Sequence, residues 1–134
     1  MVGKMTQGGL LRDYPVFWNG YRDYTPRKDV VERIAAAKGP IDVLVFFGTW
    51  NEDCIREVPK ILRVLDAAGN KDLRLALYGV DRVKRDGLGM SETFNIRRVP
   101  TTIVLRDGVE LGRIVEYPQV TAEEDLLKIL SSKP

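Results

Sequence analysis

The stretch that decides the fold is VLVFFGTWNEDCIREVP, residues 43–59. Its first five residues are all apolar and mostly β-branched or aromatic, which is typical of a strand buried on both faces. Gly48 and Thr49 end this strand, and Trp50 follows. Asn51 is a strong helix N-cap residue, because its side-chain oxygen can accept a hydrogen bond from a free amide of the first turn. The stretch therefore predicts a buried strand, a tight turn and a helix that begins at Asn51.

The only cysteine of the chain, Cys54, falls in the first turn of this predicted helix. A helix N-terminus favours the thiolate, whereas the neighbouring carboxylates of Glu52 and Asp53, and burial against the sheet, favour the neutral thiol. The residues alone leave the sign of its pKa shift open. A strand, a turn with tryptophan and a cysteine in the first helical turn is the layout of a redox site on a βαβ unit.

Two motifs carry a resemblance to the thioredoxin family. Residues 47–54, FGTWNEDC, together with Pro59, resemble the family's active-site region, where Trp-Cys-x-x-Cys is followed by a proline that kinks the helix. Residues 94–101, FNIRRVPT, are similar to the family's segment that ends in an apolar residue, a cis-proline and threonine. The similarity spans residues 29–130 approximately. It implies an α/β, thioredoxin-like fold, with a central mixed β-sheet flanked by helices.

The chain departs from the family at the first cysteine of the motif. Asn51 stands there, and only the resolving position, Cys54, is retained. Disulfide exchange needs an attacking thiolate and a second thiol that resolves the mixed disulfide, so we expect no dithiol turnover. Asn51 is either a natural loss or a substitution introduced into an active enzyme, and both interpretations stay open. Val45 and Leu77 also replace the buried aspartate and the lysine of many thioredoxins.

The resemblance assigns roles to a small set of residues. In the family, the tryptophan shields the active site, and the backbone of the residue before the cis-proline pairs with a bound peptide. The catalytic positions are Cys54 and Asn51, and the substrate-binding positions are Trp50, Val99, Pro100 and Thr101.

Three functions are compatible with these residues. The first is a thiol–disulfide oxidoreductase scaffold that cannot cycle as a dithiol. The second is a non-catalytic module that binds peptides or proteins in the cis-proline groove. The third is a monothiol peroxidase or redox sensor, which ranks last because peroxiredoxin-like motifs carry Thr and Pro where this chain has Asn51 and Phe47.

Composition narrows the remaining choices. The chain has 134 residues, a net charge of +2 and no histidine, which excludes imidazole catalysis and leaves no plausible zinc site. We expect no cofactor, no nucleic-acid or membrane partner, and a monomer that meets a disulfide- or thiol-containing protein or peptide. If the N-terminus is natural, the absence of a signal peptide predicts a cytoplasmic protein.

Periodicity and turn signals divide the chain into an N-terminal extension, residues 1–26, and a thioredoxin-like domain, residues 27–134. The extension is expected to be irregular because glycine and proline interrupt it, yet it is rich in aromatic residues. These rings either order the segment by packing on the flank of the domain or form a lip that binds a partner. In the domain, the pattern predicts helices over residues 27–38, 51–68, 90–95 and 121–130, and strands over residues 42–47, 73–80, 101–105 and 109–116.

Overall fold

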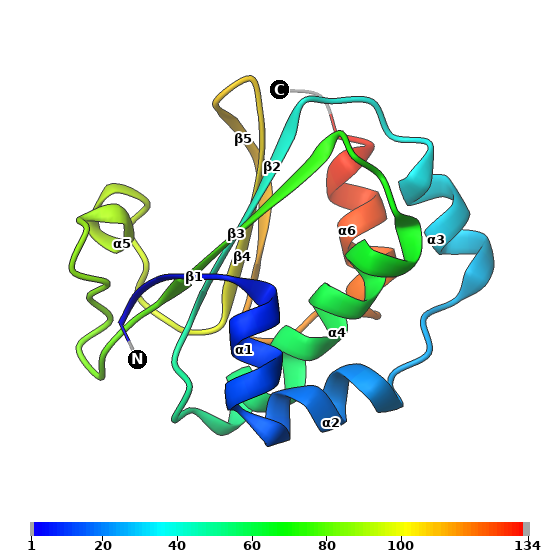
Figure 1. The fold of residues 1–134 in the computed structure, drawn as a ribbon. Helices are drawn as coiled ribbons and strands as arrows, with labels where there is room; N and C mark the ends of the chain where they lie inside the picture. Colours follow the sequence, from blue (N-terminus) through cyan, green and yellow to red (C-terminus); the bar gives the residue numbers. More distant parts are fainter. Residues whose placement is uncertain (1, 133–134) are drawn as a thin grey trace.

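The computed structural model describes residues 2–132, which form one mixed sheet with helices on both of its faces (Figure 1). The elements in chain order are β1 (Gly3–Met5), α1 (Gln7–Asp13), α2 (Pro15–Asp23), α3 (Lys28–Ala35), β2 (Ile41–Phe47), α4 (Glu52–Ala68), β3 (Leu73–Gly79), α5 (Met90–Thr93), β4 (Thr101–Arg106), β5 (Val109–Val115) and α6 (Ala122–Leu130). Every predicted element of the domain is present, with ends that differ from the predicted ones by no more than a few residues.

The strand order in the sheet is β1-β3-β2-β4-β5. β2 and β3 run parallel, whereas β4 is antiparallel to both β2 and β5, so the predicted mixed sheet is confirmed. Asp107 and Gly108 both have positive φ between β4 and β5. This backbone conformation is the one that a tight hairpin turn requires, and Asp-Gly is a favoured pair for it.

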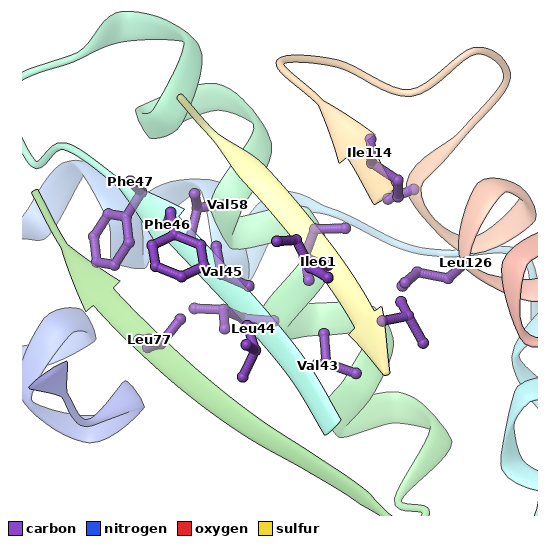
Figure 2. Packing of buried hydrophobic residues seen from close by; sticks show 14 of the residues in the cluster. Val43, Leu44, Val45, Phe46, Phe47, Val58, Ile61, Leu77, Ile114 and Leu126 are labelled. Carbon is purple, nitrogen blue, oxygen red and sulfur yellow. The ribbon is translucent and has the colours of Figure 1, made fainter. Parts of the chain in front are cut away.

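β2 lies at the centre of the sheet and is covered on both sides. Val45 and Phe47 face the layer that contains α4, and Phe47 packs edge-on against Phe17 of α2, at 5.9 Å between ring centroids. Phe46 faces the other layer, where it contacts the ring of Phe94 after α5. Figure 1 shows α5 and its flanking loops on the side of the sheet opposite α4, and Figure 2 shows the side chains of β2 packed among those of the neighbouring elements. Burial on both faces explains why this strand reads as an unbroken apolar run.

α4 begins and ends where the residues predict. The Asn51 side chain caps its N-terminus, and Gly69, with φ of 58°, caps its C-terminus in the left-handed conformation. The stripe of α4 that faces the sheet consists of Cys54, Val58, Ile61 and Leu62, all of them buried. Figure 2 shows Val58 and Ile61 within the cluster around β2.

The prediction that residues 1–26 are irregular was wrong. They contain β1, α1 and α2. Thr6 caps α1 through the amide of Gly9, and Pro15 occupies the first turn of α2, where its missing N–H costs nothing. Gly20 lies against Pro59, since a Cβ at Gly20 would come within 3.1 Å of the proline ring. Pro15 and Gly20, which were expected to interrupt regular structure, therefore start a helix and allow close packing.

Several aromatic residues of the extension pack on the domain. For these residues, the interpretation that the rings order the segment is confirmed. Phe17 is fully buried in the main core. Tyr24 donates a hydrogen bond to the buried carboxylate of Glu123 at the start of α6, and the same carboxylate accepts from the amide of Arg27 at 2.8 Å. Trp18 remains 44% exposed and stacks on the ring of Tyr21. The extension is thus tied both to the core and to α6.

Candidate functional site

Cys54 lies on the inner face of α4 and has no solvent exposure. Its Sγ accepts a hydrogen bond from the amide of Gly48 at 3.4 Å, at the end of β2. No second cysteine exists to pair with it. The sulfur is therefore part of the hydrophobic core rather than of the surface.

Burial raises the pKa of the Cys54 thiol from 9.0 to about 12. This value already includes two smaller contributions: the hydrogen bond from Gly48 lowers the pKa, and the nearby carboxylate of Asp53 raises it. The helix start, which stabilises thiolates in other settings, is outweighed here by the loss of water around the sulfur. At neutral pH the group is a thiol, and a thiol is a poor nucleophile.

Asn51 serves as the cap of α4. Its Oδ1 accepts a hydrogen bond from the amide of Cys54 at 2.9 Å, and its carbonyl accepts from the amide of Ile55 at 3.0 Å. Both oxygens accept hydrogen bonds from amides of the first helical turn, as those of an N-cap residue do. The carboxamide of Asn51 has no nucleophilic chemistry, and its oxygen is committed to the helix cap.

Trp50 packs over the turn between β2 and α4. A Cβ at Gly48 would lie 2.5 Å from the indole ring, so only glycine allows this packing. The indole Nε1 donates to the carbonyl of Val80 at 3.3 Å, and the guanidinium of Arg82 lies 4.6 Å from the ring centroid. Trp50 is half-buried, and it connects the turn to the loop that follows β3.

The segment Val99–Thr101 leads into β4, and the Val99–Pro100 peptide bond is cis. The Thr101 hydroxyl donates to the carbonyl of Arg98 at 2.7 Å, and the Pro100 carbonyl accepts from the amide of Glu116. Pro100 also lines a small apolar pocket against α4. In contrast, neither the amide nor the carbonyl of Val99 is hydrogen-bonded to any residue within the described range.

An open hollow of about 380 Å³ lies between the start of α4 and this segment. We call it the active-site hollow, because the predicted site residues Asn51 and Val99 line it. It brings together two of the predicted site residues, Asn51 and Val99, whereas Cys54, Trp50, Pro100 and Thr101 lie outside its lining. Its lining residues are Asn51, Asp53, Lys84, Arg97, Arg98, Val99 and Glu116.

The charged residues of this hollow were missed as site residues from the sequence. Lys84 belongs to a stretch that reads only as a charged loop, and Arg97 and Arg98 lie in the quoted motif without an assigned role. Arg98 pairs with Glu116 at 3.0 Å, on the neighbouring strand end. The cluster of cations at residues 82–98 is the signal that could have indicated them.

Residues 2–132 contain no group of three or more Cys, Asp or Glu side chains placed to hold a metal ion. Within the same range, no helix is both long enough and apolar enough to cross a bilayer.

Comparison with known proteins gives a consistent family likeness. No family model matches the chain. A thioredoxin of Aspergillus fumigatus is 27% identical over 103 residues, which is 77% of this chain and 89% of that protein. Among solved structures, a Pseudomonas aeruginosa protein of unknown function has a TM-score of 0.73 at 16% identity, covering 97% of this chain and 92% of its own. A mutant thioredoxin of Halobacterium salinarum has a TM-score of 0.52 at 17% identity, covering 79% of this chain and 83% of its own.

The mixed sheet with its flanking helices is an α/β fold of the thioredoxin type. In sequence, the chain resembles a thioredoxin at 27% identity. The likeness to the Pseudomonas protein covers nearly the whole chain, so the helical extension is part of a fold that another protein shares.

Proposed function

We propose that this chain is a thioredoxin-like binding module that does not cycle as a dithiol and that holds an extended polypeptide in the active-site hollow. The observation that carries the proposal is the pairing of a fully buried Cys54 with Asn51, whose side chain is committed to the cap of α4. A site of this kind retains the shape of the family's active site without its attacking group.

The chemistry of thiol exchange argues against turnover. A thiolate must reach a disulfide sulfur in line, and the resulting mixed disulfide must then be resolved by a second thiol. Cys54 is buried and protonated, and no second thiol exists in the chain. The same burial argues against a monothiol peroxidase or redox sensor, since those sites depend on an accessible, low-pKa thiolate.

Recognition of a polypeptide needs none of this chemistry. An extended peptide binds through main-chain hydrogen bonds to an unpaired backbone segment, with side-chain pockets adding selectivity. Val99 supplies an unused amide and carbonyl, and it lines the same hollow as Asn51. Half-buried Trp50 lies just before Asn51 and outside the lining, where it packs on Gly48 and fixes the turn that carries Asn51.

Titration of a short fluorescein-labelled peptide, Ser-Gln-Ser-Val-Ser-Gln-Ser, tests the proposal by anisotropy. We expect saturable binding, and the Cys54→Ser variant should bind within about twofold of the unaltered chain, because the sulfur does not line the hollow. The same peptide with N-methyl groups on alternate amides should not bind, since it cannot pair with the Val99 backbone. Loss of binding in Cys54→Ser, with the variant still folded by circular dichroism, would refute a binding role independent of the thiol.

A further inference from the structure

The side of the active-site hollow formed by residues 81–98 carries cations that have no carboxylate partner. Arg82, Arg85 and Arg97 are exposed and Lys84 is half-buried, and none of them forms an ion pair with any residue in the described part of the chain. Elsewhere most arginines are paired. The arginines outside residues 81–98 that form an ion pair with a carboxylate are Arg12, Arg22, Arg27, Arg56, Arg74 and Arg113.

The two aspartates of the same segment accept hydrogen bonds from its own backbone amides. Asp81 accepts hydrogen bonds from the amides of Val83 and Arg85 through its Oδ1. Asp86 is 1% exposed and accepts from the amides of Leu88 and Ser91. These bonds fix the loop backbone and direct the acidic groups toward it. Asp86 is thus buried and half-buried Asp81 is held against the loop backbone, whereas the arginines extend toward solvent. Glu92, in α5, is the exposed carboxylate of the segment, and it lies outside the lining of the active-site hollow.

The free cations surround the place where a peptide would lie. Lys84 and Arg97 line the hollow together with Asn51 and Val99. Arg82 extends over Trp50 at the hollow's edge. The two carboxylates of the lining are already neutralised, because Asp53 pairs with Arg56 at 2.6 Å and Glu116 pairs with Arg98.

From this arrangement we propose that the occupant of the active-site hollow is an acidic polypeptide segment, held by backbone pairing at Val99 and by contacts of its carboxylates with Lys84, Arg97 and Arg82. This inference rests on the proposed function and adds the chemical class of the ligand. Unpaired cations around a groove attract and orient an acidic partner and disfavour a basic one. A peptide fits better than a nucleic acid, because an extended peptide backbone carries its amides and carbonyls at the spacing that pairs with the Val99 amide and carbonyl.

Three labelled peptides of equal length test whether the hollow prefers an acidic ligand. They are Ser-Glu-Ser-Val-Ser-Glu-Ser, the matching glutamine peptide and the matching lysine peptide. At low ionic strength we expect the glutamate peptide to bind about tenfold more tightly than the glutamine peptide, and the lysine peptide more weakly than both. The double variant Lys84→Glu/Arg97→Glu should remove the preference for glutamate. A matched control, Arg33→Glu/Lys71→Glu, changes the net charge equally near the opposite end of β3 and should keep the preference.

The outcomes separate the two proposals. If none of the three peptides binds, the proposed function fails and the charge inference fails with it. If all three bind equally, or if the Lys84→Glu/Arg97→Glu variant keeps its preference, the hollow still binds peptides but the inference about acidic partners is wrong. If a short single-stranded oligonucleotide displaces the glutamate peptide at lower concentration than the unlabelled peptide does, the surface recognises nucleic acid and the inference is also wrong.

Discussion

At the scale of single residues, Gly48 explains much of the geometry around the sulfur. Its missing side chain leaves space for the Trp50 ring, and its amide donates to Cys54 Sγ. Any side chain at position 48 would collide with the indole and displace the tryptophan from the turn. One glycine therefore fixes both the tryptophan and the thiol, which contact the same backbone turn.

The sequence predicted the cap role of Asn51, because capping depends on a residue and its own next turn. It did not predict the sign of the Cys54 pKa shift. That sign depends on the burial of the sulfur, which is created by β2 and by elements distant in the chain. The helix cap could be predicted from neighbouring residues, whereas the loss of water around the Cys54 sulfur depends on the folded core.

The Asn51→Cys variant tests whether the scaffold still supports exchange. It restores the family's pair of cysteines, so we expect reduction of insulin by dithiothreitol to rise well above the background rate, while the unaltered chain stays at background. Asn51→Ser is the matched control, because serine also caps a helix but supplies no thiol. Turbidity of insulin measured over time gives the readout.

Two results would contradict this part of the account. Turnover by the unaltered chain would show that Cys54 works without a partner thiol. An inert Asn51→Cys variant that is folded, and whose introduced thiol forms a disulfide with Cys54 on oxidation, would show that a pair of cysteines at these positions does not make the scaffold catalytic.

At the scale of helices and strands, the domain was predictable and the extension was not. The apolar stripe of α4 and the unbroken apolar run of β2 are strong periodic signals, and both elements appear within a residue of their predicted ends. In the extension, Pro15 and Gly20 were interpreted as breakers. Their roles depend on a helix start and on contact with Pro59, which is distant in sequence.

α2 offers a direct test of whether the extension is structural. Phe17 is fully buried against Phe47, so Phe17→Ala should lower the free energy of unfolding by about 3–5 kcal/mol. Trp18, the next residue of the same helix, is 44% exposed, and Trp18→Ala should cost only about 1 kcal/mol through the lost stacking on Tyr21. Chemical denaturation of both variants provides the comparison. Equal and small losses would mean that the extension does not contribute to the core.

At the scale of the whole molecule, the fold brings together groups that the sequence separates. Three segments meet at one end of the sheet: the turn from β2 into α4, the loop after β3 and the segment before β4. The two motifs were visible in the sequence, but the cations of the loop were not assigned to the site. The hydrogen bonds of Asp81 that shape this loop are local, but the loop's position beside the start of α4 depends on the packing of the sheet.

The same architecture makes access to the sulfur a property of the entire protein. Cys54 lies between the sheet and α4, in the cluster that also contains Phe17 of the extension. A reagent can reach it only when this core opens. Its reactivity therefore reports on unfolding of the molecule rather than on a local surface.

The most direct test of the central claim is the rate at which native Cys54 reacts with a small aromatic disulfide reagent, compared with the rate in denaturant. The account predicts that the native thiol reacts at least about a thousandfold more slowly, and that Phe17→Ala accelerates it by easing the opening of the core. A native thiol that reacts as fast as the denatured one would contradict the account, since it would place the sulfur within reach of a disulfide substrate.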